Sequence, residues 1–288
     1  MSPESPEELE RVLREHGYLA DRGLSVSIFL AMRMGRPLLL EGEPGVGKTE
    51  VARTLASITG AELIRLQCYE GIDAAQALYE WDYARQMLHA RLIQAGELSG
   101  DGRVAQLYGA EFLLERPLLK AVRAGAGAVL LVDELDRADD EFEAFLLETL
   151  SDNAVTIPEL GTVTGLGAPL VVITSNRTRE LHDALKRRCL YHWLDYPDLE
   201  REVAIIRARA PEVSPALARS VADTVQKLRG LELIKKPGAA ESIDWARALA
   251  ALGIGSVEAE VARMTLGAAL KNRDDLHTVE AALPDLLK

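Results

Sequence analysis

Eight residues near the start of the chain, Gly42 to Thr49 with the sequence GEPGVGKT, constrain the fold more than any other stretch. The apolar run Pro37 to Leu40 precedes them and predicts a strand, and the pattern from Glu50 to Ala56 predicts a helix. In this order the glycines let backbone N–H groups wrap a phosphate chain at a helix N-terminus. Lys48 is then placed to reach the β- and γ-phosphates, and Thr49 to coordinate Mg²⁺. The stretch predicts a cradle for a nucleoside triphosphate rather than a glycine-rich surface turn.

A second constraint is the run Ala128 to Glu134, which reads AVLLVDE. Its continuous apolar character predicts a central parallel strand that is covered on both faces. Because ligands of open α/β sheets bind beyond the carboxyl ends of the strands, Asp133 and Glu134 are expected to approach the phosphates. We expect Asp133 to hold Mg²⁺ through its water shell and Glu134 to orient and polarise the attacking water. The alternative is that the pair only caps the helix expected from Asp139 to about Ser151.

The two stretches together give a set of candidate ligands for ATP and Mg²⁺. Thr49 and Asp133 are the expected metal ligands. The residues expected to bind the nucleotide are Gly42, Glu43, Pro44, Gly45, Val46, Gly47, Lys48, Thr49, Glu50 and Asp133.

Five predicted strands alternate with helical patterns, which is typical of a parallel α/β sheet. They span residues 37–40, 62–66, 128–134, 169–174 and 191–194. Two helices are expected before the cradle. The first opens on Ser5-Pro6-Glu7-Glu8, which has capping-box spacing and proline at the first helical position, and the second runs from about Asp21 to Met34.

Two inserts interrupt the alternating pattern, near residues 68–95 and 154–166. The second contains an alternating stretch, 155–163, that predicts a small hairpin. The first is rich in aromatic residues, and two interpretations remain open: an inserted hairpin or helix that packs its own aromatics, or a surface for a client or subunit. The stretch 96–109 is rich in Gly and polar residues and predicts a loop. The aromatic residues of the first insert are Tyr69, Tyr79, Trp81 and Tyr83.

Beyond Tyr196-Pro197-Asp198 the sequence becomes helical and poor in strands. We therefore expect an α/β core over residues 1–196 and a separate helical lid over residues 197–288. The helices expected in the lid span 199–210, 214–228, 241–252 and 257–270.

Composition excludes several classes of protein. The chain has 288 residues and 48% hydrophobic content, enough for a sizeable core, and its longest apolar run is far shorter than a membrane-spanning helix of about 18 residues. Two cysteines without a CxxC pair and five histidines without HExxH argue against disulfide frameworks and zinc sites. A formal charge of −12 disfavours nucleic acid as a partner. With no signal-peptide pattern at its start, the chain is expected in the cytoplasm.

Two further features narrow the many ATP-using classes, such as helicases, transporters and kinases. Asn176 directly follows the fourth predicted strand, where its amide can hydrogen-bond the γ-phosphate or the attacking water. Twelve residues later Arg187 and Arg188 stand at a helix end just before the fifth strand. Each signal is weak alone, since an Asn after a strand is commonly a turn residue and a basic pair commonly ends a helix.

In this order the motifs resemble those of the AAA+ ATPases over nearly the whole chain. Gly42–Thr49 matches the Walker A motif of that family and Asp133-Glu134 matches Walker B. Asn176 matches sensor 1, and Arg188 matches the arginine finger, although the adjacent Arg187 is also a candidate. The resemblance implies a five-stranded parallel sheet flanked by helices, a small all-α lid, and Glu134, Asn176 and Arg188 as catalytic residues.

The two inserts resemble those of the MoxR branch. Three segments, 66–71, 175–180 and 185–193, are similar to the CoxD-like subgroup, which is linked to maturation of carbon monoxide dehydrogenase. The resemblance implies a homo-hexameric Mg²⁺-ATP chaperone that matures a client metalloenzyme, with a molybdenum-copper site as one candidate. It also implies a partner that contains a von Willebrand factor A domain.

One position departs from the family. A sensor 2 arginine is usual near the start of the third lid helix, where this chain has Ala239-Ala240-Glu241-Ser242. Arg247, one turn further along, is a possible substitute. Two rival functions stay open: a nucleotide-gated switch with little turnover, and a DNA-acting ATPase of clamp-loader type.

Overall fold

The computed structural model describes residues 3–94 and 107–287. The chain begins with α1 (Pro6–Glu15) and α2 (Arg22–Met34). The side chain of Ser5 accepts a hydrogen bond from the Glu8 amide and proline occupies the first turn, so the predicted capping of α1 is confirmed.

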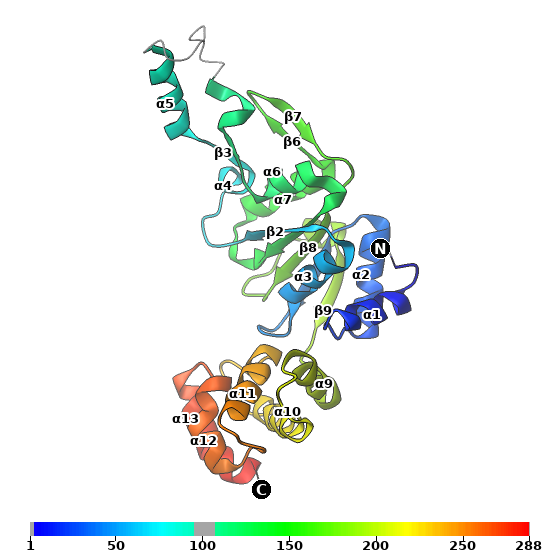
Figure 1. Cartoon of the computed structure of the whole chain (residues 1–288), viewed down its shortest axis with the longest axis vertical. Coiled ribbons are helices and arrows are strands. Elements are labelled where there is room, and N and C mark those ends of the chain that lie inside the picture. The colour runs from blue at the N-terminus through cyan, green and yellow to red at the C-terminus, as the bar shows by residue number, and fades with distance from the viewer. Residues whose placement is uncertain (1–2, 95–106, 288) are drawn as a thin grey trace. The chain divides into compact units, whose positions relative to one another are not determined.

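The five predicted strands form one parallel sheet (Figure 1). The strand order is β2-β5-β8-β1-β9. Leu63 pairs with Val129 across β2 and β5, and Val129 pairs with Leu170 across β5 and β8, so Asp133 ends a strand that has neighbours on both sides. The strands are β1 (Leu38–Gly42), β2 (Glu62–Gln67), β5 (Ala128–Asp133), β8 (Leu170–Ser175) and β9 (Leu190–Leu194).

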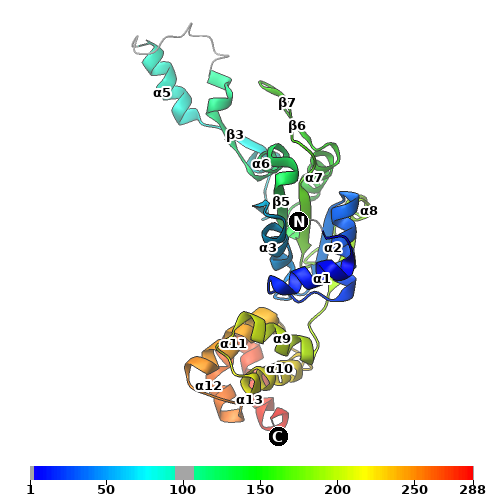
Figure 2. The same ribbon diagram turned by 45° about the vertical axis from the view of Figure 1, so that its right-hand side comes forward.

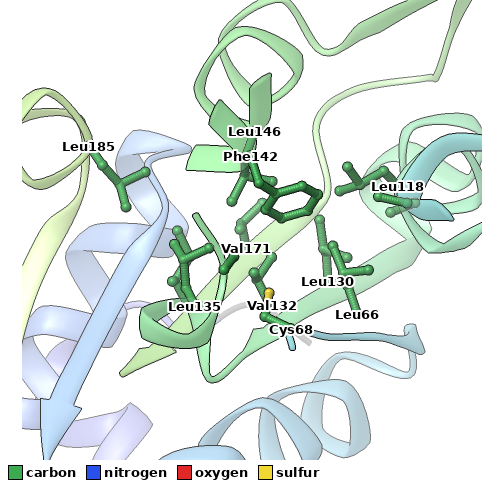
Figure 3. Close-up of a cluster of buried hydrophobic side chains, with 14 of the residues drawn as sticks. Leu66, Cys68, Leu118, Leu130, Val132, Leu135, Phe142, Leu146, Val171 and Leu185 are labelled. Atoms are coloured by element: carbon green, nitrogen blue, oxygen red, sulfur yellow. The ribbon is translucent and has the colours of Figure 1, made fainter. Parts of the chain in front are cut away.

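Helices connect and cover the strands. Asp139 caps α7 by accepting a hydrogen bond from the Phe142 amide, which fixes the start of the helix that follows the carboxylates. The covering elements are α3 (Lys48–Thr59), α6 (Pro117–Ala124), η3 (Gly125–Gly127), η4 (Leu135–Arg137), α7 (Asp140–Asp152) and α8 (Asp183–Arg188). Figure 3 shows Phe142 and Leu146 of α7 against the strand residues Val132 and Val171. These contacts form a dry core beneath the end of β5.

The first insert contains both helices and a strand. It comprises α4 (Ala74–Leu78), β3 (Tyr79–Trp81) and α5 (Tyr83–Gln94), and β3 pairs with β4 (Leu113–Glu115), which follows η2 (Ala110–Phe112). The second insert is the predicted hairpin, β6 (Ala154–Ile157) with β7 (Gly161–Thr164). Both views show α5 and this hairpin extending beyond the sheet (Figures 1 and 2). The loop predicted at 96–109 lies largely outside the described residues.

The aromatics of the first insert divide into two groups. Trp81 is buried and packs edge-on against Tyr79 and Tyr108, with Phe112, Val155 and Ile157 in the same cluster. Tyr69 and Tyr83 are exposed. The two inserts therefore share one small core, and the interpretation that this segment packs its own aromatics holds for Tyr79 and Trp81.

The C-terminal region is all helical. A buried ion pair joins its first two helices: Arg229 donates to both carboxylate oxygens of Glu202, at 2.6 and 2.7 Å. Ser242 donates to the same carboxylate, and Arg229 lies over the Tyr196 ring at 4.5 Å. The fifth helix, α13, was not among the predicted ones. The helices are α9 (Leu199–Arg209), α10 (Pro215–Arg229), α11 (Ala239–Ala251), α12 (Ala259–Ala269) and α13 (Arg273–Leu286).

The contacts within the chain divide it into two compact units. The first contains Ser27–Leu40 and the described part of Leu55–His192. The second contains Pro3–Val26, Glu41–Thr54 and residues 193–287. The cradle thus belongs to the same unit as the C-terminal helices, and the two carboxylates belong to the other. The domain boundary expected at 196/197 stays a prediction.

Candidate nucleotide site

The cradle is built from backbone shapes that require glycine. Gly42 ends β1 with a φ of +154°, and a Cβ there would lie 2.3 Å from the carbonyl oxygen of Leu194. Gly47 has a φ of +97°, but the nearest atom to its added Cβ is 3.8 Å away, in the Tyr18 ring. The first glycine is therefore required by packing as well as by conformation.

This difference gives a stability prediction. Gly42→Ala is expected to lower the free energy of unfolding by about 2–4 kcal/mol, because it adds a backbone clash to an unfavourable φ. Gly47→Ala, which adds the φ penalty without the clash, is expected to lower it by only about 1–2 kcal/mol. Urea titration followed by circular dichroism compares the two. Equal losses would show that the contact with Leu194 does not matter.

Lys48 points back across the loop that it follows. Its ammonium donates to the carbonyl oxygens of Gly42 at 2.6 Å and of Glu43 at 2.8 Å, and the side chain is buried. The positive charge therefore sits within the cradle at the N-terminus of α3, where a phosphate chain is bound in loops of this sequence.

The C-terminal helices contact the cradle within the second unit. The Ala240 amide donates to the Gly45 carbonyl at 3.3 Å, and a Cβ on Gly238 would lie 2.7 Å from the Gly45 Cα. Arg209 at the end of α9 forms a 2.8 Å ion pair with Glu50. The segment that precedes α11 and the end of α9 thus both touch residues expected to bind nucleotide.

A buried hydroxyl lies near the start of α11, where the resemblance implied a sensor 2 arginine. Ser242 donates to Glu202 at 2.5 Å and to the Gly238 carbonyl at 3.1 Å. Arg247, the possible substitute, donates to Glu212 and to the Arg209 carbonyl. A role for Arg247 at the nucleotide stays a prediction.

In the other unit, Asp133 is held by two neighbouring strands. The Thr174 hydroxyl of β8 donates to its Oδ1 at 2.6 Å. The Arg65 guanidinium of β2 donates to its Oδ2 from Nε at 3.0 Å and from Nη2 at 2.6 Å. The carboxylate is only 3% exposed, so these hydrogen bonds stabilise a charge that burial alone would destabilise.

Glu134 follows in a left-handed backbone conformation, with φ 56° and ψ 50°. Its amide donates to the Thr174 hydroxyl at 2.9 Å, which fixes this turn of the chain. Its carboxylate accepts a hydrogen bond from Gln67 at 3.1 Å and pairs with Arg137 at 3.0 Å. The two acidic residues therefore have different partners and different orientations, an arrangement beyond what capping a helix requires.

Asn176 lies at the end of β8, the strand beside the one that carries the carboxylates. The backbone amide of Asn176 donates to the Asp136 carboxylate at 3.2 Å. The backbone amide and the hydroxyl of Thr178 donate to the same buried carboxylate at 2.8 and 2.7 Å. Asp136 therefore fixes the loop after β8 to the loop after β5. Because β5 and β8 pair in parallel, Asn176 and Glu134 lie at the same edge of the sheet, and a catalytic role for either residue stays a prediction.

Arg188 ends α8 and is exposed. Its Nη1 donates to the Ser151 hydroxyl at 2.8 Å and to the Leu147 carbonyl at 3.3 Å, both on α7. Arg36 donates to the backbone carbonyls of Arg187, Arg188 and Cys189. A cavity of about 600 Å³ adjoins these arginines; it is lined by Gly35, Arg36, Pro37, Leu147, Leu150, Ser151, Leu185, Arg187, Arg188 and Cys189. Arg187 and Arg188 thus lie at the surface, and hydrogen bonds from Arg36 to their backbone carbonyls hold them there.

Both cysteines are free and buried. Burial raises the pKa of the Cys68 thiol to about 12, and the charges of Asp133 and Asp136 contribute to the rise. Burial likewise raises the pKa of Cys189 to about 12, against the opposing charge of Arg36. Neither thiol is ionised near neutral pH, so neither is a nucleophile of this site.

Four residues of the site were not predicted from the sequence: Arg65, Gln67, Asp136 and Thr174. Arg65 and Gln67 are polar and two positions apart near the end of β2, so they share one face of the strand, and this is the pattern that would have indicated them. What the pattern does not contain is the strand order that places β2 beside β5.

A family model described as "AAA domain (dynein-related subfamily)" matches residues 37–189, which is more than half of the chain and contains both motifs. The chain is a member of this AAA family. Midasin of Giardia intestinalis is 31% identical to this chain over 131 residues, which are 45% of the chain and 2% of midasin. The denitrification regulatory protein NirQ of Stutzerimonas stutzeri is 26% identical over 210 residues, 70% of the chain and 66% of NirQ.

The fold of the AAA protein is shared with solved structures. One mutant form of RuvB from Thermotoga maritima matches 95% of the chain and 77% of RuvB, with 18% identity and a TM-score of 0.51. At this identity the likeness shows the fold alone. It confirms the predicted α/β sheet flanked by helices together with a helical C-terminal region.

The described residues show neither a membrane-spanning helix nor a cluster of side chains that would hold a metal ion. None of the helices within 3–94 and 107–287 is long and apolar enough to cross a membrane. The same residues contain no group of three or more His, Cys, Asp and Glu side chains that would hold a metal ion.

Proposed function

We propose that the AAA protein is a Mg²⁺-dependent ATPase of MoxR type that remodels a client protein. The observation that carries this proposal is the pair of carboxylates at the end of β5. Asp133 is oriented by Thr174 and Arg65, whereas Glu134 is turned by its left-handed backbone toward Gln67 and Arg137. One carboxylate for the cation and another for the water is the division of labour that hydrolysis of a triphosphate needs.

The remaining roles in this proposal follow from the sequence motifs. The backbone of residues 42–49 and the Lys48 ammonium bind the phosphates. Glu50, the next residue of α3, also contacts the nucleotide. The hard oxygens of Thr49 and Asp133 fit Mg²⁺, which would neutralise charge on the β- and γ-phosphates. Glu134 orients water, and Asn176 donates to the γ-phosphate or to that water.

The biological setting is part of the same proposal. Identity to NirQ, whose name places that protein in the regulation of denitrification, supports a MoxR-type regulatory chaperone. Within this proposal the chain forms a homo-hexamer in the cytoplasm and works with a von Willebrand factor A domain protein. Its client is a metalloenzyme, with carbon monoxide dehydrogenase as the candidate suggested by the CoxD-like segments.

The test is Glu134→Gln. We expect this variant to bind ATP with unchanged affinity and to hydrolyse it about 10²–10⁴ times more slowly, because it loses the group that accepts a proton from water. Phosphate release and binding of fluorescent methylanthraniloyl-ATP measure the two properties. Lys48→Ala, in contrast, is expected to lose binding itself.

Glu141→Gln is the matched control, since Glu141 is an exposed carboxylate on α7. Normal turnover by Glu134→Gln would contradict the assignment of Glu134. A wild-type chain that binds ATP tightly without turnover would favour the switch alternative. Turnover stimulated by DNA in a salt-dependent way would favour the DNA-acting alternative.

A further inference from the structure

We infer that Arg65 is a positioning residue that competes with the divalent cation for Asp133 and so sets how much Mg²⁺ the protein needs. This inference rests on the proposed function, because it takes Asp133 to be the residue that receives the cation. It concerns a side chain of β2 that lies outside the nucleotide-binding motifs.

Both hydrogen bonds from Arg65 to Asp133 go to the same carboxylate oxygen. Thr174 donates to the inner oxygen, Oδ1, whereas Arg65 directs two N–H groups at Oδ2. Asp133 is 3–4% exposed, but the Arg65 side chain is 48% exposed. The guanidinium thus covers a buried carboxylate from the solvent side.

A hydrated cation and a guanidinium require the same lone pairs. Mg²⁺ keeps several waters when it binds near phosphates, and those waters donate to the carboxylate. Arg65 already directs two donors at Oδ2, so a water that donates to this oxygen must displace at least one of them. The charge of Arg65 also opposes a second positive charge at short range.

Arg65 has a second acceptor. Its Nη2 also donates to the Oε1 of Gln67, and the amide of Gln67 donates to Glu134. The guanidinium can therefore retain a hydrogen bond as it leaves Asp133. Movement of the guanidinium would therefore change its hydrogen bond with Gln67. Gln67 in turn links the cation ligand to the residue that orients water.

A structural role for Arg65 predicts something different. If Arg65 only neutralised a buried charge, its loss would lower stability and leave cation binding unchanged. The other cations of this region face other groups: Arg137 pairs with Glu134, and Lys120 pairs with Glu62 at the opposite end of β2. Lys120 is 49% exposed, so Lys120→Ala removes the same charge from the same strand neighbourhood without touching Asp133.

The experiment measures Mn²⁺, as a paramagnetic substitute for Mg²⁺, in the presence of the non-hydrolysable analogue β,γ-imido-ATP. Electron paramagnetic resonance of free Mn²⁺ gives its dissociation constant for the complex of the full chain with the analogue. We expect Arg65→Ala and Arg65→Gln to bind Mn²⁺ about three- to tenfold more tightly than wild type, the scale of the net contribution of one hydrogen bond. Lys120→Ala is expected to stay within about twofold of wild type, because surface charges at that distance are screened.

Unchanged or weaker Mn²⁺ binding by both folded Arg65 variants would overturn the inference while leaving the proposed function intact. A tenfold or larger loss of analogue binding in EDTA would overturn it too, because Arg65 would then contact the nucleotide. A wild-type chain that binds neither analogue nor Mn²⁺ would overturn the proposed function and the inference with it. Thermal melting by circular dichroism verifies folding, and Arg65→Gln keeps the test valid if the alanine variant does not fold.

Discussion

Arg188→Ala is expected to lower the maximal rate of ATP hydrolysis by about 10³–10⁵ while ATP still binds, since arginine fingers stabilise charge that develops only in the transition state. In the structure Arg188 donates to the Ser151 hydroxyl and the Leu147 carbonyl, two neutral acceptors at an exposed helix end. Hydrogen bonds of this kind contribute only about 1 kcal/mol net, so a phosphate of a neighbouring protomer would readily replace them. Steady-state phosphate release over a wide range of protein concentration measures the effect.

Arg187→Ala is the matched control, because it removes the same charge one position earlier on the same helix end. Mixing Arg188→Ala with wild type extends the test. The variant keeps its own cradle, so loss of wild-type activity on mixing would place the finger in a neighbour's site. A full rate from Arg188→Ala together with a loss from Arg187→Ala would transfer the role to Arg187.

Arg229→Met is expected to lower the free energy of unfolding by about 3–5 kcal/mol, because it leaves the Glu202 carboxylate buried without its counter-charge. Glu202 is 0% exposed, and Arg229 donates to both of its oxygens. Ser242 and Gln226 also donate to this carboxylate, but neither carries a charge. Urea titration followed by circular dichroism measures the loss.

The control is Arg219→Met on the same helix, whose partner Glu200 is exposed, so little stability should be lost. A loss at Arg229 no larger than this control would show that the buried pair adds nothing. Because the Arg229 Nε also donates to the Pro237 carbonyl, the same variant frees the segment that precedes α11. We therefore expect its nucleotide affinity to fall along with its stability.

Much of the fold could be predicted because the sheet is buried on both faces. Continuous apolar runs such as Ala128 to Val132 have few alternatives to a central strand, and the observed β5 ends at Asp133, one residue before the predicted end. Pairing between distant short segments is different. β3 is three residues long and pairs with β4, a segment far along the chain, and neither has a pattern of its own. Helix α13 was not predicted, although Asn272 caps its start and Pro284 falls only in its last turn.

The site divides in the same way. Lys48, Asp133 and Glu134 could be predicted, because a glycine loop and the end of a strand are each formed by consecutive residues. Arg65 and Thr174 act on Asp133 only because β2 and β8 are the neighbours of β5, and strand order is a property of tertiary packing. Asp136 could not be assigned from the sequence either, because its partners Asn176 and Thr178 are 40 and 42 residues away.

The left-handed conformation of Glu134 sets stability against function at this position. A non-glycine residue in that region of backbone space costs roughly 1–2 kcal/mol, and Asn or Gly would adopt it at a lower cost. Selection for a stable fold alone would therefore favour a different residue here. A stabilised variant of this chain that keeps Glu134 has to gain its stability elsewhere, and a library selected only for folding should drift away from glutamate at this position.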